Sequence, residues 1–440
     1  MLIISLLFLA YNALSWVLLF RDLWTLEVIT TKFYPQWSNQ IQNITNFLSI
    51  FKLNTVPTVV FIILIILLFY FYFKIINKSV SVKSVIICSI CFQAIVFFSY
   101  PVLSTDVLSY ILSDRVNVVY HQNVWTTKPN EFVKDPYYYL VYPIYKTNDW
   151  TNMTRIYGGV NQLIYSPVTA LSGNDLIANL ASHKLVVLFF VLATLLVIPS
   201  AMVFLNPLFI IETVGSGHND IIMLFFTVLS LTFPNPILSG LFLGLATQVK
   251  TTPALLFVFL CLKMLSDLKI KKLILFILSY VLTVGVIYFF MGVNPTDTIV
   301  RTAGSINVYW QSLPMLIRSP ILNYLLIVFL AFQAARTLVY KLNIIEIFAQ
   351  TLMIYLLFFL AAFWNWYPIW LLVLVPFLPE KSGIKPYILA FTFSSMLGYA
   401  AYWISLRFNY QFFLWPVIIY LTVLSGPAII CLQDIKKKYL

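Results

Sequence analysis

Four polar side chains stand close together between two strongly apolar runs of the chain. The stretch IIETVGSGHNDIIMLFF (210–226) contains Glu212, His218, Asn219 and Asp220. Carboxylate, imidazole and amide groups can move protons, contact an anion or hydrogen-bond the hydroxyl groups of a ligand. Ionisable groups are costly within a membrane-like setting and usually mark a functional site. We therefore interpret this stretch as the lining of a reaction cavity.

A second candidate for chemistry is Asp106, in the sequence YPVLSTDVLSYILSDR after the third apolar run. A carboxylate that is half shielded from water suits a general base. The residues also suit a helix start, at which Ser104, Thr105 or Asp106 would be the N-cap, and both interpretations stay open. Tyr110 falls four residues on and shares a helix face with Asp106, while Arg115 lies beside that face.

Lys250 interrupts the apolar run SGLFLGLATQVKTTPALLFVFLCLKML (239–265) and is followed by Thr251, Thr252 and the helix breaker Pro253. A lysine at the centre of one spanning helix would be costly. Two half-length helices that meet at Lys250 would instead bring it to a cavity on the outer side, close to Asp106. The alternative is a lysine that snorkels from a helix end.

The elements that must position these groups are membrane helices. Of the 440 residues 61% are hydrophobic and 10% are charged, which excludes a soluble globule. Apolar windows of helix-spanning length recur and the alternation of a β-barrel is absent. We expect an all-α polytopic membrane protein with 11 to 14 helices, several of them half-length, at 2–20, 55–76, 84–103, 184–199, 201–215, 219–234, 237–250, 253–266, 272–293, 320–340, 345–363, 366–379, 386–405 and 411–431.

Two polar stretches, 104–182 and 294–319, separate three groups of helices and give five regions, and a further polar stretch lies within the first region. The larger stretch is rich in Tyr, Asn, Pro and Trp, and we expect it to carry short interfacial helices and the catalytic group. The regions are the N-terminal helices with an outer loop at 21–53 (1–103), the outer catalytic loop (104–182), the core helices (183–293), a further outer loop (294–319) and the C-terminal helices (320–440).

The distribution of Lys and Arg predicts the orientation. Alternate connections, among them 263–272 and the tail 436–438, carry a net charge of +10, whereas the opposite side carries +2. Because cytoplasmic loops are enriched in Lys and Arg, we expect both termini in the cytoplasm. Topology and anionic lipid headgroups account for the total charge of +12, so no nucleic-acid partner is needed.

Five motifs between residues 100 and 375 occur in an order that resembles a known family. They are Asp106 with Tyr110 and Arg115, then YGGVNQLIYSP, NPLFIIETVGSGHND, LGLATQVKTTP and WNWYPIWLL. This order resembles the polyprenyl-phosphate-sugar-dependent GT-C glycosyltransferases, particularly the bacterial and archaeal alpha-mannosyltransferases. The resemblance implies a GT-C-like helix bundle in a prokaryotic plasma membrane, an active site on the outer face, and Asp106 as catalytic carboxylate. YGGV departs from the family's usual Tyr-Gly-Pro, which affects the backbone near Gly158.

The residues support this chemistry. A polyprenyl-phosphate sugar needs an apolar groove, a cation near the headgroups and a base for the incoming hydroxyl of a glycolipid or glycan acceptor. Asp106 would take that proton as the hydroxyl attacks the anomeric carbon with inversion, in analogy to the base of inverting glycosidases. Lys250 and His218 are the first choices for the donor phosphate, and Arg301 and Arg318 are further candidates.

Other polar and aromatic residues are candidates for contacts with the sugar or the acceptor: Tyr110, Arg115, Tyr157, Glu212, Asn219, Asp220, Trp364, Trp366 and Tyr367. The tryptophans fit a sugar-stacking platform and equally an interfacial aromatic belt. The scheme requires no metal, although a divalent metal bound by carboxylate oxygens is an alternative. The rival function is a lipid or solute transporter or flippase, in which broken helices would mark a midplane site.

Overall fold

The structure is a computed structural model that describes residues 1–20, 22–50, 56–141, 150–292, 311–340, 343–407 and 414–439. The regular elements in these ranges are all helices. Seven of them are long and apolar enough to cross a membrane: Leu2–Leu19, Val56–Ile76, Leu176–Val197, Ile270–Met291, Ile321–Val339, Ile384–Ile404 and Trp415–Lys437. The expected all-α polytopic membrane fold is confirmed, and the chain is an integral membrane protein.

The helix count depends on how short apolar helices are treated. An eighth span is present if the bent pair Pro207–Gly215 and Asp220–Thr232 is counted as one. Several of the 11 to 14 expected spans are helices of only 10 to 17 residues, some of which begin at a proline: Val82–Phe97, Pro236–Thr247, Pro253–Ser266, Ile344–Phe359 and Pro368–Phe377. Proline suits the first turn of a helix but interrupts a longer one, so these apolar runs are broken rather than continuous.

The chain forms two compact units, which we describe in turn. The first unit comprises Met1–Leu196 and Ile210–Ile222, and the second comprises Val197–Phe209 and Met223–Leu440.

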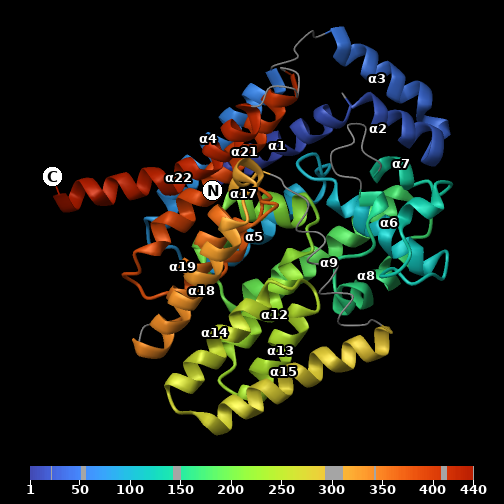
Figure 1. The fold of residues 1–440 in the computed structure, drawn as a ribbon. Coiled ribbons are helices and arrows are strands. Elements are labelled where there is room, and N and C mark those ends of the chain that lie inside the picture. The colour runs from blue at the N-terminus through green and yellow to red at the C-terminus, as the bar shows by residue number, and fades with distance from the viewer. Residues whose placement is uncertain are drawn as a thin grey trace. The chain divides into compact units, whose positions relative to one another are not determined.

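In the first unit, α1 (Leu2–Leu19) packs against α4 (Val56–Ile76) and α5 (Val82–Phe97), as Figure 1 shows in blue. The end of this group is joined to the segment after α5, because the Tyr100 N–H donates to Ser15 Oγ over 3.0 Å. That segment leads directly to the candidate site.

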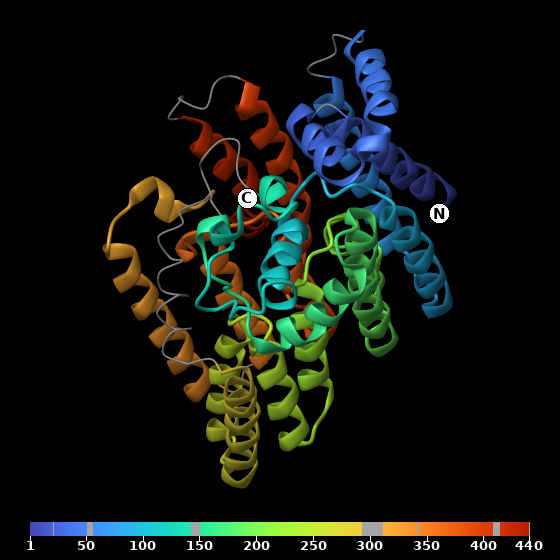
Figure 2. The same cartoon turned by 90° about the vertical axis from the view of Figure 1, so that its right-hand side faces the viewer.

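The polar part of the first unit is built on α6 (Asp106–Val118) and α8 (Gly159–Ser172), which lie side by side. Figure 2 shows them in cyan and green. Short helices occur in the chain between them, as the expected catalytic loop predicted. Residues of α6 form one hydrophobic core with Tyr34 of the N-terminal loop and with Tyr137 of the chain between α6 and α8.

Helix α9 (Leu176–Val197) begins eight residues before the predicted span 184–199. Asp175 marks the start, since its Oδ1 accepts the Ala178 N–H over 2.7 Å. The sequence boundary was wrong because Asn179 and neighbouring polar residues resemble a loop, whereas Asn179 is fully buried within the unit.

In the second unit, α13 (Pro236–Thr247) approaches α15 (Ile270–Met291) very closely. A Cβ atom placed on Gly240 would lie 2.5 Å from the Phe276 carbonyl oxygen, and one placed on Gly244 would lie 2.9 Å from a side-chain carbon of α15. Small residues four apart allow two membrane helices to pack backbone to backbone. The glycines therefore set the spacing of this helix pair.

The rest of the second unit contains α14 (Pro253–Ser266), α18 (Ile321–Val339) and α19 (Ile344–Ile354), with α21 (Ile384–Arg407) and α22 (Leu414–Tyr439) packed together along their length (red in Figure 1). The remaining helices in the described ranges are short: α2 (Leu23–Val28), η1 (Ile29–Phe33), η2 (Pro35–Trp37), α3 (Ser38–Ile50), η3 (Pro129–Phe132), α7 (Tyr138–Val141), η4 (Trp150–Asn152), α10 (Ala201–Phe204), α11 (Pro207–Ile210), η5 (Ile211–Gly215), α12 (Asp220–Thr232), α17 (Leu313–Ile317), η6 (Tyr355–Phe359), α20 (Pro368–Leu372) and η7 (Val375–Phe377).

Candidate active site

Asp106 is the first residue of α6, and Thr105 is the N-cap. The Asp106 N–H donates to Ser104 Oγ over 3.2 Å, so a neighbouring hydroxyl satisfies one of the free amides at this helix start. Asp106 itself is half-buried. Its position differs from that of an N-cap residue, and a pocket opens beside it.

This pocket is lined by Asp106, Ser109 and Tyr110 of α6 and by Arg155 and Tyr157 of the segment before α8, among others. The Tyr110 hydroxyl donates to Asp106 Oδ2 over 3.4 Å, and the Tyr157 hydroxyl donates to Tyr110 Oη over 3.4 Å. Burial, with the charge of Asp106 as a further cause, raises the pKa of both tyrosines well above its usual value. Both phenols therefore keep their protons and act as hydrogen-bond donors beside the carboxylate.

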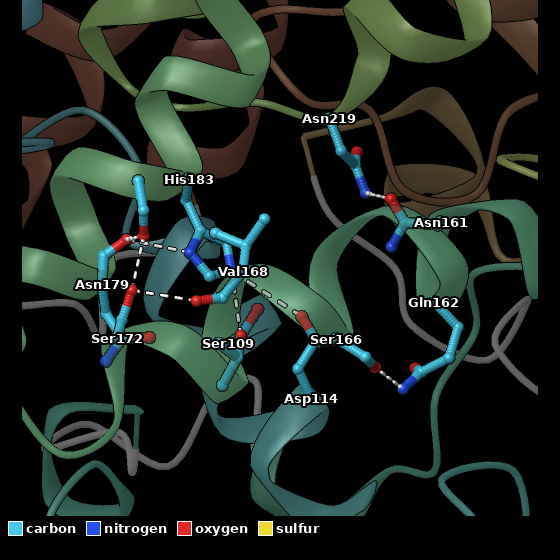
Figure 3. Close-up of polar contacts among 12 residues, drawn as sticks. Ser109, Asp114, Asn161, Gln162, Ser166, Val168, Ser172, Asn179, His183 and Asn219 are labelled. Atoms are coloured by element: carbon cyan, nitrogen blue, oxygen red, sulfur yellow. Dashed lines mark hydrogen bonds and ion pairs between the residues drawn. The ribbon is translucent and has the colours of Figure 1, made fainter. Parts of the chain in front are cut away.

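Arg155 is a pocket residue that the sequence analysis missed. It is 5% exposed, and its Nη1 lies 2.5 Å from Asp114 Oδ1 and also bonds to Gln162. Gln162 in turn bonds to Ser166, as Figure 3 shows. The Nε and Nη2 donors have no hydrogen-bond partner among the described residues. The sequence signal that could have found Arg155 is its place two residues before Tyr157, beside the YGGVNQLIYSP motif.

Glu212 and His218 lie on either side of a tight turn and are both fully buried. Glu212 belongs to the π-helix η5, a form that is frequent at functional sites. Gly217 makes the turn at a φ of 77°, and a Cβ there would lie 3.2 Å from Val107 of α6. This close approach brings His218 Nδ1 to 3.5 Å from Tyr110 Oη, while its Nε2 lies 3.1 Å from Glu212 Oε2. The structure thus brings the buried GHND stretch to the helix of Asp106.

The last residue of this stretch, Asp220, begins the next helix, and Asn219 directly precedes it. Asn219 Nδ2 donates to Asn161 Oδ1 over 3.2 Å, which joins the turn to the first turn of α8 (Figure 3). Asp220 is the first residue of α12 and is fully buried. The chain bends by 118° between Pro207–Gly215 and α12, so the polar stretch forms the corner of a broken helix.

In the second unit, Lys250 lies in the break between α13 and α14, as the sequence predicted. Its Nζ lies 5.8 Å from the Tyr367 ring centroid and 5.7 Å from that of Trp370. The two rings stack on each other at 4.1 Å. A cation over aromatic faces is stabilised electrostatically, so two motifs more than 100 residues apart in sequence form one cluster.

Residues 23–266 match the family model described as "Alpha-(1->6)-mannopyranosyltransferase, N-terminal domain". The chain belongs to this family. The match covers more than half of the 440 residues and includes Asp106, His218 and Lys250. The family is one of alpha-mannosyltransferases, so the helices described above are those of a membrane glycosyltransferase. No curated protein and no solved structure matches the chain significantly.

The other residues predicted to bind the donor or the sugar in this glycosyltransferase have different surroundings. Trp364 and Trp366 stack at 5.3 Å, with Trp366 buried and Trp364 half-buried. Arg318 is exposed at the end of α17, where it adopts a φ of 45°. Arg301 lies outside the described residues. Their contacts with substrate remain predictions.

Arg115 of the glycosyltransferase joins two segments of the first unit through an ion pair and hydrogen bonds. Its Nε lies 2.8 Å from Asp135 Oδ2, its Nη1 donates to the Gly173 carbonyl over 2.9 Å, and its Nη2 donates to Asn174 Oδ1 over 2.8 Å. The guanidinium also lies 5.0 Å from the Tyr137 ring centroid. These contacts hold the loop to the start of α9, and the sugar contact predicted for Arg115 stays a prediction.

Two ionisable residues of α9 were not among the predicted site residues. His183 Nδ1 lies 2.8 Å from the Asn179 carbonyl oxygen (Figure 3). Lys184 Nζ donates to the carbonyls of Phe97 and Ser99 over 3.1 and 2.5 Å, at the end of α5. Neither residue lines the pocket. Among the described residues, no group of three or more His, Cys, Asp and Glu side chains could hold a metal ion.

Proposed function

We propose that the chain transfers mannose from a polyprenyl-phosphate donor to a hydroxyl of a glycolipid or glycan acceptor, with Asp106 as general base. The observation that carries the proposal is the carboxylate of Asp106 in a pocket with two protonated phenols and a buried arginine. A membrane helix bundle of a mannosyltransferase family supplies the setting. No metal is required in this scheme.

The reaction is a single displacement. The acceptor oxygen attacks the anomeric carbon as its proton passes to Asp106, and the bond from that carbon to the phosphate oxygen breaks. The phosphate leaves with the electron pair, so no protein acid is needed. A displacement of this kind inverts the anomeric carbon, and an alpha product therefore requires a donor with the opposite anomeric configuration.

Cations that could contact the donor phosphate occur in both units. Arg155 supports this role in the first unit, because two of its donors have no hydrogen-bond partner among the described residues. Lys250 and the exposed Arg318 are the candidates in the second unit, with Arg301 and His218 as the other predicted contacts. Arginine can contact a phosphate through two parallel hydrogen bonds, whereas lysine contributes a point charge.

The proposed orientation rests on charge. Lys and Arg are concentrated in alternate connections and in the C-terminal tail, which supports cytoplasmic termini and an active site on the outer face of a prokaryotic plasma membrane. The polyprenyl tail would stay in the bilayer while the phosphate reaches the headgroup level.

The test is donor consumption by the purified protein in lipid nanodiscs. Polyprenyl-phosphate mannose and a crude glycolipid extract are added, and the release of polyprenyl phosphate is followed by mass spectrometry. We expect Asp106→Asn to lower the rate by about 100-fold or more, the scale of a lost general base. Asp175→Asn is the matched control, because this exposed N-cap residue lies outside the pocket and asparagine also caps well. Equal release by wild type and Asp106→Asn would refute the assignment of the base.

A further inference from the structure

A line of polar groups leads from the pocket into the protein interior. It runs from Asp106 Oδ2 to Tyr110 Oη over 3.4 Å, from Tyr110 Oη to His218 Nδ1 over 3.5 Å, and from His218 Nε2 to Glu212 Oε2 over 3.1 Å. Tyr110 is 1% exposed, and His218 and Glu212 are fully buried. Of this line, only Asp106 takes part in the proton transfer described above, and the buried pair of His218 and Glu212 has no role in that step.

The hydroxyl of Tyr110 has one proton and two acceptors within reach. When His218 is neutral with its proton on Nε2, its Nδ1 is an acceptor and competes with Asp106 for the Tyr110 proton. When His218 is protonated, its Nδ1–H donates to Tyr110 Oη, and the Tyr110 proton is directed to Asp106. The oxygen of Tyr110 has two lone pairs, so it can accept from His218 and from Tyr157 together.

Glu212 favours the protonated form of His218 over the neutral form. The Glu212 carboxylate lies 3.1 Å from His218 Nε2, a contact without hydrogen-bond geometry, and its negative charge stabilises the imidazolium, which needs such a partner when it is buried. With Glu212 in place, the Tyr110 hydroxyl therefore donates to Asp106 and stabilises its ionised form. Without Glu212, His218 becomes an acceptor and Asp106 loses this hydrogen bond.

We propose that Glu212 and His218 are positioning residues that control, through the single proton of Tyr110, how tightly the base Asp106 holds a proton. The proposal rests on the proposed function, because it assigns a partner to the same base. It gives His218 a task that differs from the phosphate contact predicted from the sequence. A phosphate contact would change donor binding, whereas a positioning role changes the pH dependence of turnover.

Other charged and titratable groups surround the line. Lys184 of α9 packs next to Gly217, but its ammonium bonds to backbone carbonyls. The negative charge of Asp220 in α12 contributes to the raised pKa of Tyr110 and of Tyr157, whereas the positive charge of Arg155 lowers the pKa of Tyr157. Tyr11 of α1 lies close enough to Glu212 to interact electrostatically with its carboxylate. These groups are the same in all the variants below, so they set the absolute position of the pH profile and not the differences between variants.

The test is the pH dependence of kcat for wild type, Tyr110→Phe, Glu212→Gln and the double variant, with saturating polyprenyl-phosphate mannose. Each single variant removes a hydrogen bond to the ionised Asp106, so the acid limb moves to higher pH by roughly one unit, the scale of one bond to a charged group. In the double variant the limb moves no further than in Tyr110→Phe, because the hydroxyl that transmits the effect is already absent. Donor KM stays the same in Glu212→Gln.

Two outcomes would overturn the proposal: a Glu212→Gln profile that coincides with the wild-type profile, or a Glu212→Gln shift that persists in full on the Tyr110→Phe background. Failure of the proposed function is a different result, namely Asp106→Asn with undiminished activity. His183→Gln is the matched control for loss of a buried histidine, since His183 bonds to Asn179 and has no contact with Tyr110 among the described residues. It is expected to lower stability without moving the acid limb.

A second measurement needs no donor. The chain has only three histidines, so the ¹⁵N-histidine NMR spectrum of the protein in nanodiscs can be assigned with one substitution at each. We expect the His218 resonances to differ between Glu212→Gln and wild type at one fixed pH, because the carboxylate 3.1 Å from its Nε2 is gone. Unchanged His218 resonances in Glu212→Gln would show that Glu212 does not control this histidine.

Discussion

The contact of α13 with α15 predicts opposite effects for the same substitution at two glycines of these helices. In Gly240→Ala the new Cβ would lie 2.5 Å from the Phe276 carbonyl oxygen, which is backbone and cannot rotate away. Overpacking of this kind costs about 1–3 kcal/mol. In Gly285→Ala, on the exposed face of α15, nothing lies within 4 Å of the new atom. There the helix gains about 0.5–1 kcal/mol, because alanine loses less backbone entropy than glycine.

The assay is thermal unfolding of the two variants in the same nanodiscs at one scan rate, since membrane proteins commonly unfold irreversibly. We expect Gly240→Ala to unfold several degrees below wild type and Gly285→Ala at or above it. The pair controls for the loss of glycine and for the added methyl group. An unfolding temperature that is equal in Gly240→Ala and wild type would refute the inferred close packing of α13 on α15.

Two further predictions concern the charged groups of each unit. Asp114→Asn leaves the buried Arg155 without its carboxylate partner, so we expect the free energy of unfolding to fall by about 3–5 kcal/mol. Thermal or denaturant unfolding measures this loss, and an unchanged unfolding midpoint would contradict the buried ion pair. Lys250→Met removes the cation that lies over Tyr367 and Trp370, so we expect the donor KM to rise by about tenfold or more with a smaller change in kcat, and Lys250→Arg to retain part of the affinity. Equal KM values in wild type and Lys250→Met would exclude the phosphate contact.

Local patterns predicted much of the candidate site. Apolar length predicted the membrane helices, and the four-residue spacing placed Tyr110 on the face of Asp106, where the two side chains hydrogen-bond. The proline after Lys250 predicted the break between α13 and α14. These features depend on residues near each other in sequence, for which helix geometry is decisive.

Pairings between distant segments could not be predicted in this way. Arg155 bonds to Asp114, which lies 41 residues earlier, and Asn219 bonds to Asn161, which lies 58 residues earlier. No spacing rule links such residues, because their contact depends on how helices pack. The same limit explains the late predicted start of α9, where polar residues are buried against other helices of the unit.

The bonds of Lys184 to the end of α5 also bear on how the chain enters the membrane during synthesis. A lysine near the middle of a lone inserting helix costs roughly 2.5–3.5 kcal/mol. The carbonyl that accepts its shortest bond belongs to Ser99, which is made 85 residues earlier and is already present when α9 leaves the ribosome. Insertion of α9 is therefore expected to be assisted by a helix that precedes it, so the order of the helices in the chain is itself part of the assembly of the first unit.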